Sequence, residues 1–153
     1  MSTKTDIAVD GAAPGGAAQV GAEATAAPPS PAGRAIVVDD DALLRFMLSD
    51  ALQARGFEVQ TAEDATAGLR LLSESILTLD VLITDVLMPG QDGIEFVRTI
   101  RTLGGESELV LVAVTASADP SHRTRLIEAG ADFVLDKSIG VAAIAQAVGE
   151  VVL

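Results

Sequence analysis

The chain has 153 residues, 49% of them hydrophobic, so it is large enough for one folded domain and is not a wholly disordered polypeptide. It carries 22 acidic residues against 10 lysines and arginines, and this net charge of −12 argues against direct nucleic-acid binding, which needs clustered cations. The absence of cysteine excludes disulfides and thiolate chemistry, and no apolar run approaches the roughly 18–20 residues that span a bilayer. The N-terminus lacks a signal-peptide pattern, so we expect a soluble, cytoplasmic protein without membrane insertion.

Residues 1–33 differ in composition from everything that follows. Alanine, glycine and proline dominate from Gly11 to Gly33, and no aromatic residue precedes Arg34. Such a segment cannot bury enough apolar surface to offset the entropy lost on ordering. We therefore predict a flexible tail over residues 1–33, either an inert extension or a docking arm, and one folded domain over residues 34–153.

From Arg34 onward, short apolar runs alternate with segments that repeat apolar residues at helical spacing. In chain order, these patterns predict strand 35–38, helix 43–52, strand 57–59, helix 65–73, strand 81–84, helix 94–101, strand 109–114, helix 121–129, strand 133–135 and helix 141–152. The alternation indicates βαβ units and strands buried on both faces. The predicted fold class is therefore α/β, a doubly wound (βα)5 fold with a five-stranded parallel sheet of the flavodoxin-like type.

Polar residues stand at the ends of four of the predicted strands. Asp39 and Asp40 follow the first strand, Asp85 the third, Thr115 the fourth and Lys137 the fifth. Right-handed crossovers place the carboxyl ends of all parallel strands along one edge of the sheet, where open α/β sheets hold their sites. We therefore expect these five side chains to gather there.

This set of side chains has a specific chemistry. Three crowded carboxylates repel one another unless a cation intervenes, and Mg²⁺ suits oxygen ligands where phosphate is also handled. A threonine hydroxyl and a lysine ammonium can both donate to phosphoryl oxygens. The combination of a carboxylate nucleophile, a metal and two donors indicates an acyl-phosphate site.

Four stretches of the sequence carry a family resemblance. They are Ile36 to Asp41, Leu82 to Gly93, Val114 to Ala116, and Gly130 to Lys137. Together, and in this order, they resemble the receiver domain of two-component response regulators over essentially the whole of residues 35–152.

That resemblance implies a role for each residue of the site. Asp85 would be the phosphoacceptor, taking its phosphoryl group from the phosphohistidine of a sensor histidine kinase or a histidine phosphotransfer protein. Asp40 and Asp85 would bind Mg²⁺ directly, Asp39 would act mainly through a bound water, and the backbone carbonyl of Leu87 would be a further ligand.

The remaining implied roles concern the phosphoryl group. The hydroxyl of Thr115 and the backbone N–H of Ala116 would donate to it, and Lys137 would hold one of its oxygens. Two nearby residues have simpler interpretations. Asp41 reads as the N-cap of the first helix, and His122, the single histidine, as a solvated helix residue.

The sequence also departs from the family pattern. Ser138 follows Lys137 where receivers usually have proline, so we expect a trans peptide and an altered loop. The usual aromatic switch position on the fifth strand is Val134, and the neighbouring Phe133 should face the opposite side of the sheet. The apolar Leu87 cannot orient a hydrolytic water, so we predict slow self-dephosphorylation.

The last predicted helix is apolar nearly all round, which favours a docking surface or a homodimer contact there. We expect a stand-alone response regulator, not an enzyme on other substrates, that signals through contact with a downstream protein. Two alternatives stay open. One is a phosphate-independent adaptor with a receiver fold, and the other is a haloacid dehalogenase-type phosphatase, suggested by Asp39-x-Asp41.

Overall fold

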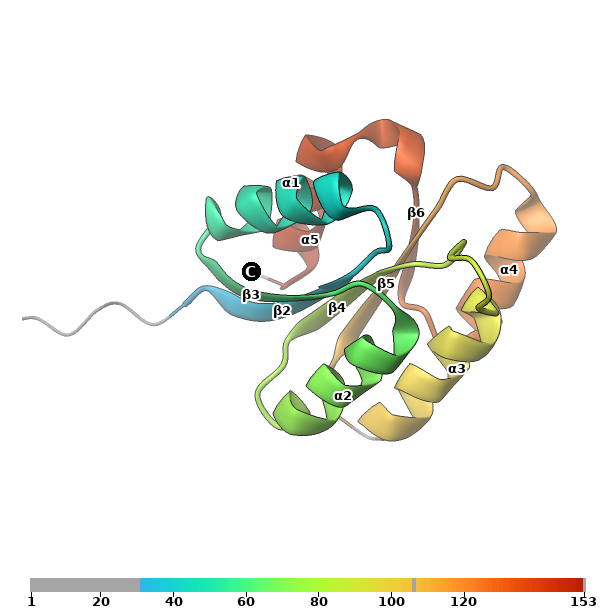
Figure 1. Ribbon diagram of the computed structural model, residues 1–153, viewed down its shortest axis with the longest axis horizontal. Coiled ribbons are helices and arrows are strands. Elements are labelled where there is room, and N and C mark those ends of the chain that lie inside the picture. Colours follow the sequence, from blue (N-terminus) through green and yellow to red (C-terminus); the bar gives the residue numbers. More distant parts are fainter. Residues whose placement is uncertain (1–30, 106, 153) are drawn as a thin grey trace, which may run out of the picture. The chain divides into compact units, whose positions relative to one another are not determined.

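A computed structural model describes residues 31–105 and 107–152. These residues form a five-stranded parallel sheet in the order β3-β2-β4-β5-β6, as the sequence predicts (Figure 1). The strands are β2 (Gly33–Val38), β3 (Phe57–Ala62), β4 (Val81–Asp85), β5 (Val110–Thr115) and β6 (Phe133–Asp136).

Five helices connect and follow these strands, and their bounds lie within a few residues of the predicted ones. They are α1 (Ala42–Gln53), α2 (Ala65–Ser75), α3 (Gly93–Gly104), α4 (Pro120–Ala129) and α5 (Val141–Val152). A short 3₁₀ helix, η1 (Lys137–Ile139), was not predicted. The (βα)5 fold class is therefore confirmed.

The helices cover both faces of the sheet (Figure 1). Helices α1 and α5 contribute Leu52 and Ile144 to the apolar cluster on one face. Helices α2, α3 and α4 supply Leu72, Ile100 and Leu126 to the cluster on the other face. Because β4 lies in the middle, all five of its residues are buried, which explains its continuous apolar run.

Aspartate side chains begin the first four helices. Asp41, Asp64, Asp92 and Asp119 have extended backbones and accept hydrogen bonds from N–H groups in the first turns of α1, α2, α3 and α4. These contacts satisfy amides that have no partner within the helix. The predicted capping role of Asp41 is confirmed.

The N-terminal border of the fold lies close to the predicted one. β2 begins at Gly33, and the N–H of Ala32 donates to the carbonyl of Gly56. The rest of the predicted tail, residues 1–30, lies outside the described residues. In the part of the chain that is described, no helix is long and apolar enough to cross a membrane.

Candidate functional site

The register of the sheet brings the predicted site residues to one edge. Val38 of β2 pairs with Thr84 of β4, so the next residue of each strand, Asp39 and Asp85, reach the edge side by side. Thr115 at the end of β5 pairs with Asp136 of β6, so Lys137 follows one step beyond. The parallel sheet thus brings residues almost a hundred positions apart, Asp39 and Lys137, to the same edge.

Three carboxylates meet at this edge. Asp39, Asp40 and Asp85 each offer an oxygen, and these three oxygens lie within 4.8 Å of one another. Asp39 and Asp85 are buried, whereas Asp40 is exposed to solvent. Oxygen donors of this kind fit a hard divalent cation such as Mg²⁺, so the residues present fit the metal that the family implies.

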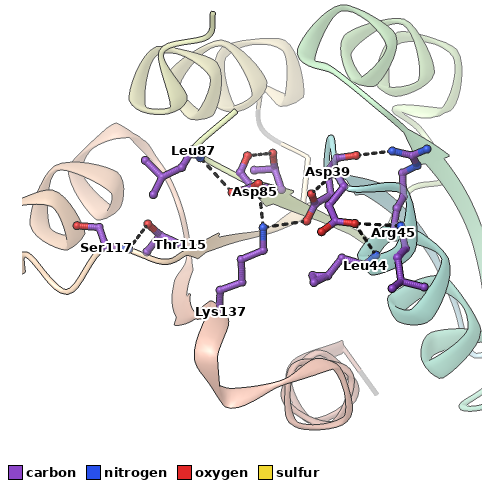
Figure 2. A network of polar contacts seen from close by, with 11 residues as sticks. Asp39, Leu44, Arg45, Asp85, Leu87, Thr115, Ser117 and Lys137 are labelled. Carbon is purple, nitrogen blue, oxygen red and sulfur yellow. Dashed lines mark hydrogen bonds and ion pairs between the residues drawn. The ribbon is translucent and has the colours of Figure 1, made fainter. Parts of the chain in front are cut away.

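Lys137 lies between two of these carboxylates. Its Nζ is 3.0 Å from Oδ2 of Asp85 and 3.3 Å from Oδ2 of Asp39 (Figure 2). Burial acts to lower the pKa of Lys137, but its contacts with Asp85 and Asp39 outweigh that effect and raise the pKa. The side chain is therefore an ammonium ion at neutral pH and the cation nearest to the acidic cluster.

The pKa of Asp39 is also raised, which for a carboxyl group disfavours the charged form. Burial, and next the negative charge of Asp85, raise the pKa of Asp39, although the Asp41 N–H and Lys137 partly offset them. Keeping these carboxylates ionised therefore costs free energy, and a bound cation would reduce that cost.

Asp85 also has a donor on its other oxygen. The backbone N–H of Leu87 donates to Oδ1 at 3.0 Å, while the Leu87 side chain is 50% exposed (Figure 2). Both carboxylate oxygens of Asp85 are therefore hydrogen-bonded. The role of the Leu87 carbonyl as a metal ligand stays a prediction.

Thr115 and Ala116 end the neighbouring strand and stand slightly apart. Thr115 is buried, and its Oγ1 accepts from the N–H of Ser117 at 3.1 Å rather than contacting Asp85 (Figure 2). Ala116 follows it and is exposed. The structure thus brings together Asp39, Asp40, Asp85 and Lys137, and leaves the phosphoryl-binding roles of Thr115 and Ala116 as predictions.

One polar contact of the site was missed at the sequence level. Nη1 of Arg45 donates to the main-chain oxygen of Asp39 at 2.7 Å. Arg45 lies four residues after the N-cap Asp41, so it shares a helix face with the cap. That spacing is a sequence signal from which the contact between Arg45 and the acidic segment could have been predicted.

The departures from the family pattern have visible structural consequences. The described residues contain no cis peptide bond, so the Lys137–Ser138 link is trans as predicted, and η1 forms there with the Ser138 N–H on Asp136. Val134 is 5% exposed and Phe133 is 41% exposed. Their opposite orientations confirm that Phe133 does not occupy the position of Val134.

His122, interpreted from the sequence as a solvated helix residue, is half-buried. Its Nε2 is buried and has no hydrogen-bond partner, and the side chain lines a cavity of about 510 Å³ with Leu87 and Met88. Residues of the loop after β4 and His122 of α4 line this same pocket.

The apolar last helix is only partly accounted for by the core. Ile144, Ala145 and Val148 of α5 are buried, whereas Val151 is 37% exposed beside Phe133 of β6. A docking or dimer contact on this side stays a prediction.

Comparison with known proteins places this site in context. The family model described as the response regulator receiver domain matches residues 35–149. The chain is 36% identical over 104 residues to the response regulator MprA of Mycobacterium sp. (strain KMS), covering 68% of this chain and 44% of that protein. It is 35% identical over 111 residues to the sensor histidine kinase RcsC of Escherichia coli (strain K12), covering 72% of this chain and 11% of that protein.

Solved structures show the same fold. The signal receiver domain of the putative response regulator NarL from Mycobacterium tuberculosis matches with a TM-score of 0.70 and 27% identity, over 81% of this chain and 98% of that chain. The chemotaxis protein CheY4 of Vibrio cholerae matches with a TM-score of 0.69 and 28% identity, over 79% of this chain and 98% of that chain. The chain therefore spans whole receiver domains but less than half of the curated relatives MprA and RcsC.

Proposed function

This chain belongs to the response regulator receiver domain family of two-component systems, and from that premise we propose that it accepts a phosphoryl group on Asp85. The donor is a phosphohistidine on a sensor histidine kinase or a histidine phosphotransfer protein. The observation that carries the proposal is the placement of Lys137, which contacts Asp85 and Asp39 beside a third carboxylate, that of Asp40.

The chemical step follows from the contacts of Asp85. One carboxylate oxygen attacks phosphorus, the P–N bond of the phosphohistidine breaks, and the imidazole nitrogen keeps the electron pair of that bond. An acyl phosphate forms on Asp85. Lys137, already 3.0 Å from Oδ2, then donates to a phosphoryl oxygen instead of the carboxylate.

Asp39, Asp40 and Asp85 would hold Mg²⁺, with the carbonyl of Leu87 as a further ligand. Bound there, the ion would neutralise charge on the transferring phosphoryl group. Thr115 and Ala116 end the adjacent strand, from which a hydroxyl and an N–H can reach the phosphoryl group once the Thr115–Ser117 contact opens.

The consequence of phosphorylation is a change in protein contacts. Phosphorylation shifts an existing equilibrium between two conformations, and a downstream protein binds one of them more tightly. A stand-alone role in the cytoplasm and a homodimer through α5 belong to this proposal.

An adaptor that works without phosphate is the second candidate, and Val134 favours it. Where receivers usually carry an aromatic switch, this buried valine has no ring to reorient. The acidic site would then be a remnant, and binding of the downstream protein would not depend on Asp85.

The decisive experiment is intact-mass analysis after incubation with acetyl phosphate and Mg²⁺. We expect one phosphoryl group on the wild-type chain and none on Asp85→Asn or without Mg²⁺. Asp50→Asn is the matched control, because Asp50 is exposed on α1 away from the site and should leave phosphorylation unchanged.

Two results would contradict the proposal. A folded wild-type chain that takes no phosphoryl group from acetyl phosphate or from a phosphohistidine donor would favour the adaptor. Steady turnover of p-nitrophenyl phosphate by the wild type, lost in Asp39→Asn, would favour the haloacid dehalogenase-type phosphatase instead.

A further inference from the structure

Asp39, which follows β2, is held by four contacts. Its N–H donates to the carbonyl of Ala62 at 3.1 Å, and its Oδ1 accepts from the N–H of Asp41 at 2.9 Å. Its Oδ2 pairs with Lys137, and its carbonyl oxygen accepts from Arg45 (Figure 2). Only the last contact comes from an α-helix side chain.

Arg45 lies in α1, the helix that follows the acidic segment Asp39–Asp41, and its side chain reaches back to that segment. Its backbone N–H donates to the carbonyl of Asp41 at 2.9 Å, while its guanidinium donates to the carbonyl of Asp39 at 2.7 Å. The side chain is half-buried, so this charge-assisted hydrogen bond is less weakened by solvent than one at the surface. The arginine side chain thus ties the Asp39 end of the Asp39–Asp41 segment to α1, while the Asp41 end is held by the ordinary backbone hydrogen bond of the helix.

Resting on the proposed function, we propose that Arg45 is a positioning residue of the metal site. By fixing the main chain at Asp39, its guanidinium holds the carboxylates of Asp39 and Asp40 where a divalent cation can bind both. Groups that orient metal ligands in this way affect metal affinity without contacting the ion.

The positive charge of Arg45 has the opposite effect on Mg²⁺ affinity from its positioning role. A guanidinium near the acidic cluster repels Mg²⁺, so removing a purely electrostatic arginine would make Mg²⁺ bind more tightly. A positioning arginine gives weaker binding when it is removed. The sign of the change therefore separates the two roles.

The test compares Arg45→Met, which keeps the aliphatic stem, with Arg45→Lys, which keeps a charged donor. The chain has no Trp or Tyr, so Mg²⁺ binding is measured by titration calorimetry of the full chain rather than by fluorescence. We expect Arg45→Met to weaken Mg²⁺ binding about tenfold, and Arg45→Lys to recover most of the loss.

Arg70→Met is the control for loss of one positive charge, because Arg70 is exposed on α2. It should leave Mg²⁺ affinity nearly unchanged. Tighter or unchanged binding in Arg45→Met overturns the proposal, as does a loss that Arg45→Lys does not reduce.

A metal-free measurement keeps this test separate from the proposed function. Amide hydrogen exchange at Asp41, whose N–H bonds to Oδ1 of Asp39, should be faster in Arg45→Met and near wild type in Arg45→Lys. Unchanged exchange in Arg45→Met overturns the positioning role even if the wild type binds no Mg²⁺. A wild type that takes no phosphoryl group, together with faster exchange in Arg45→Met, overturns the proposed function alone.

Discussion

At the scale of single residues, the central feature is a buried carboxylate with donors on both of its oxygens. Asp85 receives the Lys137 ammonium on one oxygen and the Leu87 N–H on the other. A buried charge is tolerated only when it is paired in this way. The same contacts hold the Asp85 carboxylate, the proposed nucleophile, in one orientation.

Lys137 is therefore expected to stabilise the fold as well as the phosphorylated state. Lys137→Met leaves Asp39 and Asp85 facing each other without a cation, so we expect a loss of about 1–3 kcal/mol in unfolding free energy at pH 7. Urea denaturation followed by circular dichroism measures it.

The control for this prediction is a double-mutant cycle. Combined with Asp85→Asn, which removes one of the two charges, Lys137→Met should cost clearly less than it does alone. Strict additivity of the two changes would show that the ion pair contributes nothing to stability.

Leu87 gives a second prediction at this scale. Its side chain is half exposed beside Asp85, the proposed phosphoacceptor, and an amide there could orient a water for attack on the acyl phosphate. We expect Leu87→Asn to shorten the lifetime of the phosphorylated state several-fold, measured as loss of the phosphoryl mass with time. Leu77→Asn, at a fully exposed position in the loop before β4, should not change it. Equal lifetimes for Leu87→Asn and the wild type would contradict this role.

At the scale of elements, the start of α3 is packed against the loop that leaves the site. A Cβ added at Gly93 would lie 2.1 Å from the backbone oxygen of Val86, the residue after Asp85. Because that neighbour is main chain, it cannot give way by a side-chain rotation. The glycine is what allows α3 to begin so close to the end of β4.

We therefore expect Gly93→Ala to cost about 3 kcal/mol or more of unfolding free energy, by the mechanism of an overpacked core. Gly104→Ala, at the other end of the same helix, meets its nearest atom at 3.4 Å and should be neutral or slightly stabilising. Thermal denaturation of both variants checks the pair. Similar melting temperatures would mean that the backbone at Gly93 can shift freely.

At the scale of the whole molecule, two apolar clusters pack against the sheet, while its carboxyl edge carries three carboxylates that repel one another. The clusters lie on the two faces, and β4 contributes to both through Ile83 on one side and Leu82 on the other. The core therefore supports an acidic edge that is unfavourable by itself. Any cation that binds the folded edge and not the unfolded chain should stabilise the entire domain.

Mg²⁺ should accordingly raise the unfolding free energy by about 2.7 kcal/mol at a concentration one hundred times its dissociation constant. Asp40→Asn should remove most of this gain with little effect on metal-free stability, because Asp40 is exposed. Asp50→Asn is the control and should keep the full gain. Melting curves with and without Mg²⁺ measure the effect, and equal gains in Asp40→Asn and wild type would exclude Asp40 as a ligand.

Much of this architecture was determined by the sequence alone, because the relevant signals are local. The alternation of strand and helix patterns predicted the parallel sheet, and Asp41 at the head of an apolar helix predicted its own capping contact. Residues at strand ends need only the topology to be placed on a common edge. For that reason the sequence is enough to group Asp39, Asp40, Asp85 and Lys137.

Only the tertiary structure decided which groups make contact within that edge. The hydrogen bonds of Arg45 to Asp39 and of the Leu87 N–H to Asp85, and the burial of Nε2 of His122, depend on how loops pack against the helices. The engagement of Thr115 with Ser117 rather than Asp85 belongs to the same class. Hydrophobic periodicity specifies which face of an element is buried, but hydrogen bonds need donor and acceptor aligned within a few tenths of an ångström, and that alignment exists only after the elements pack.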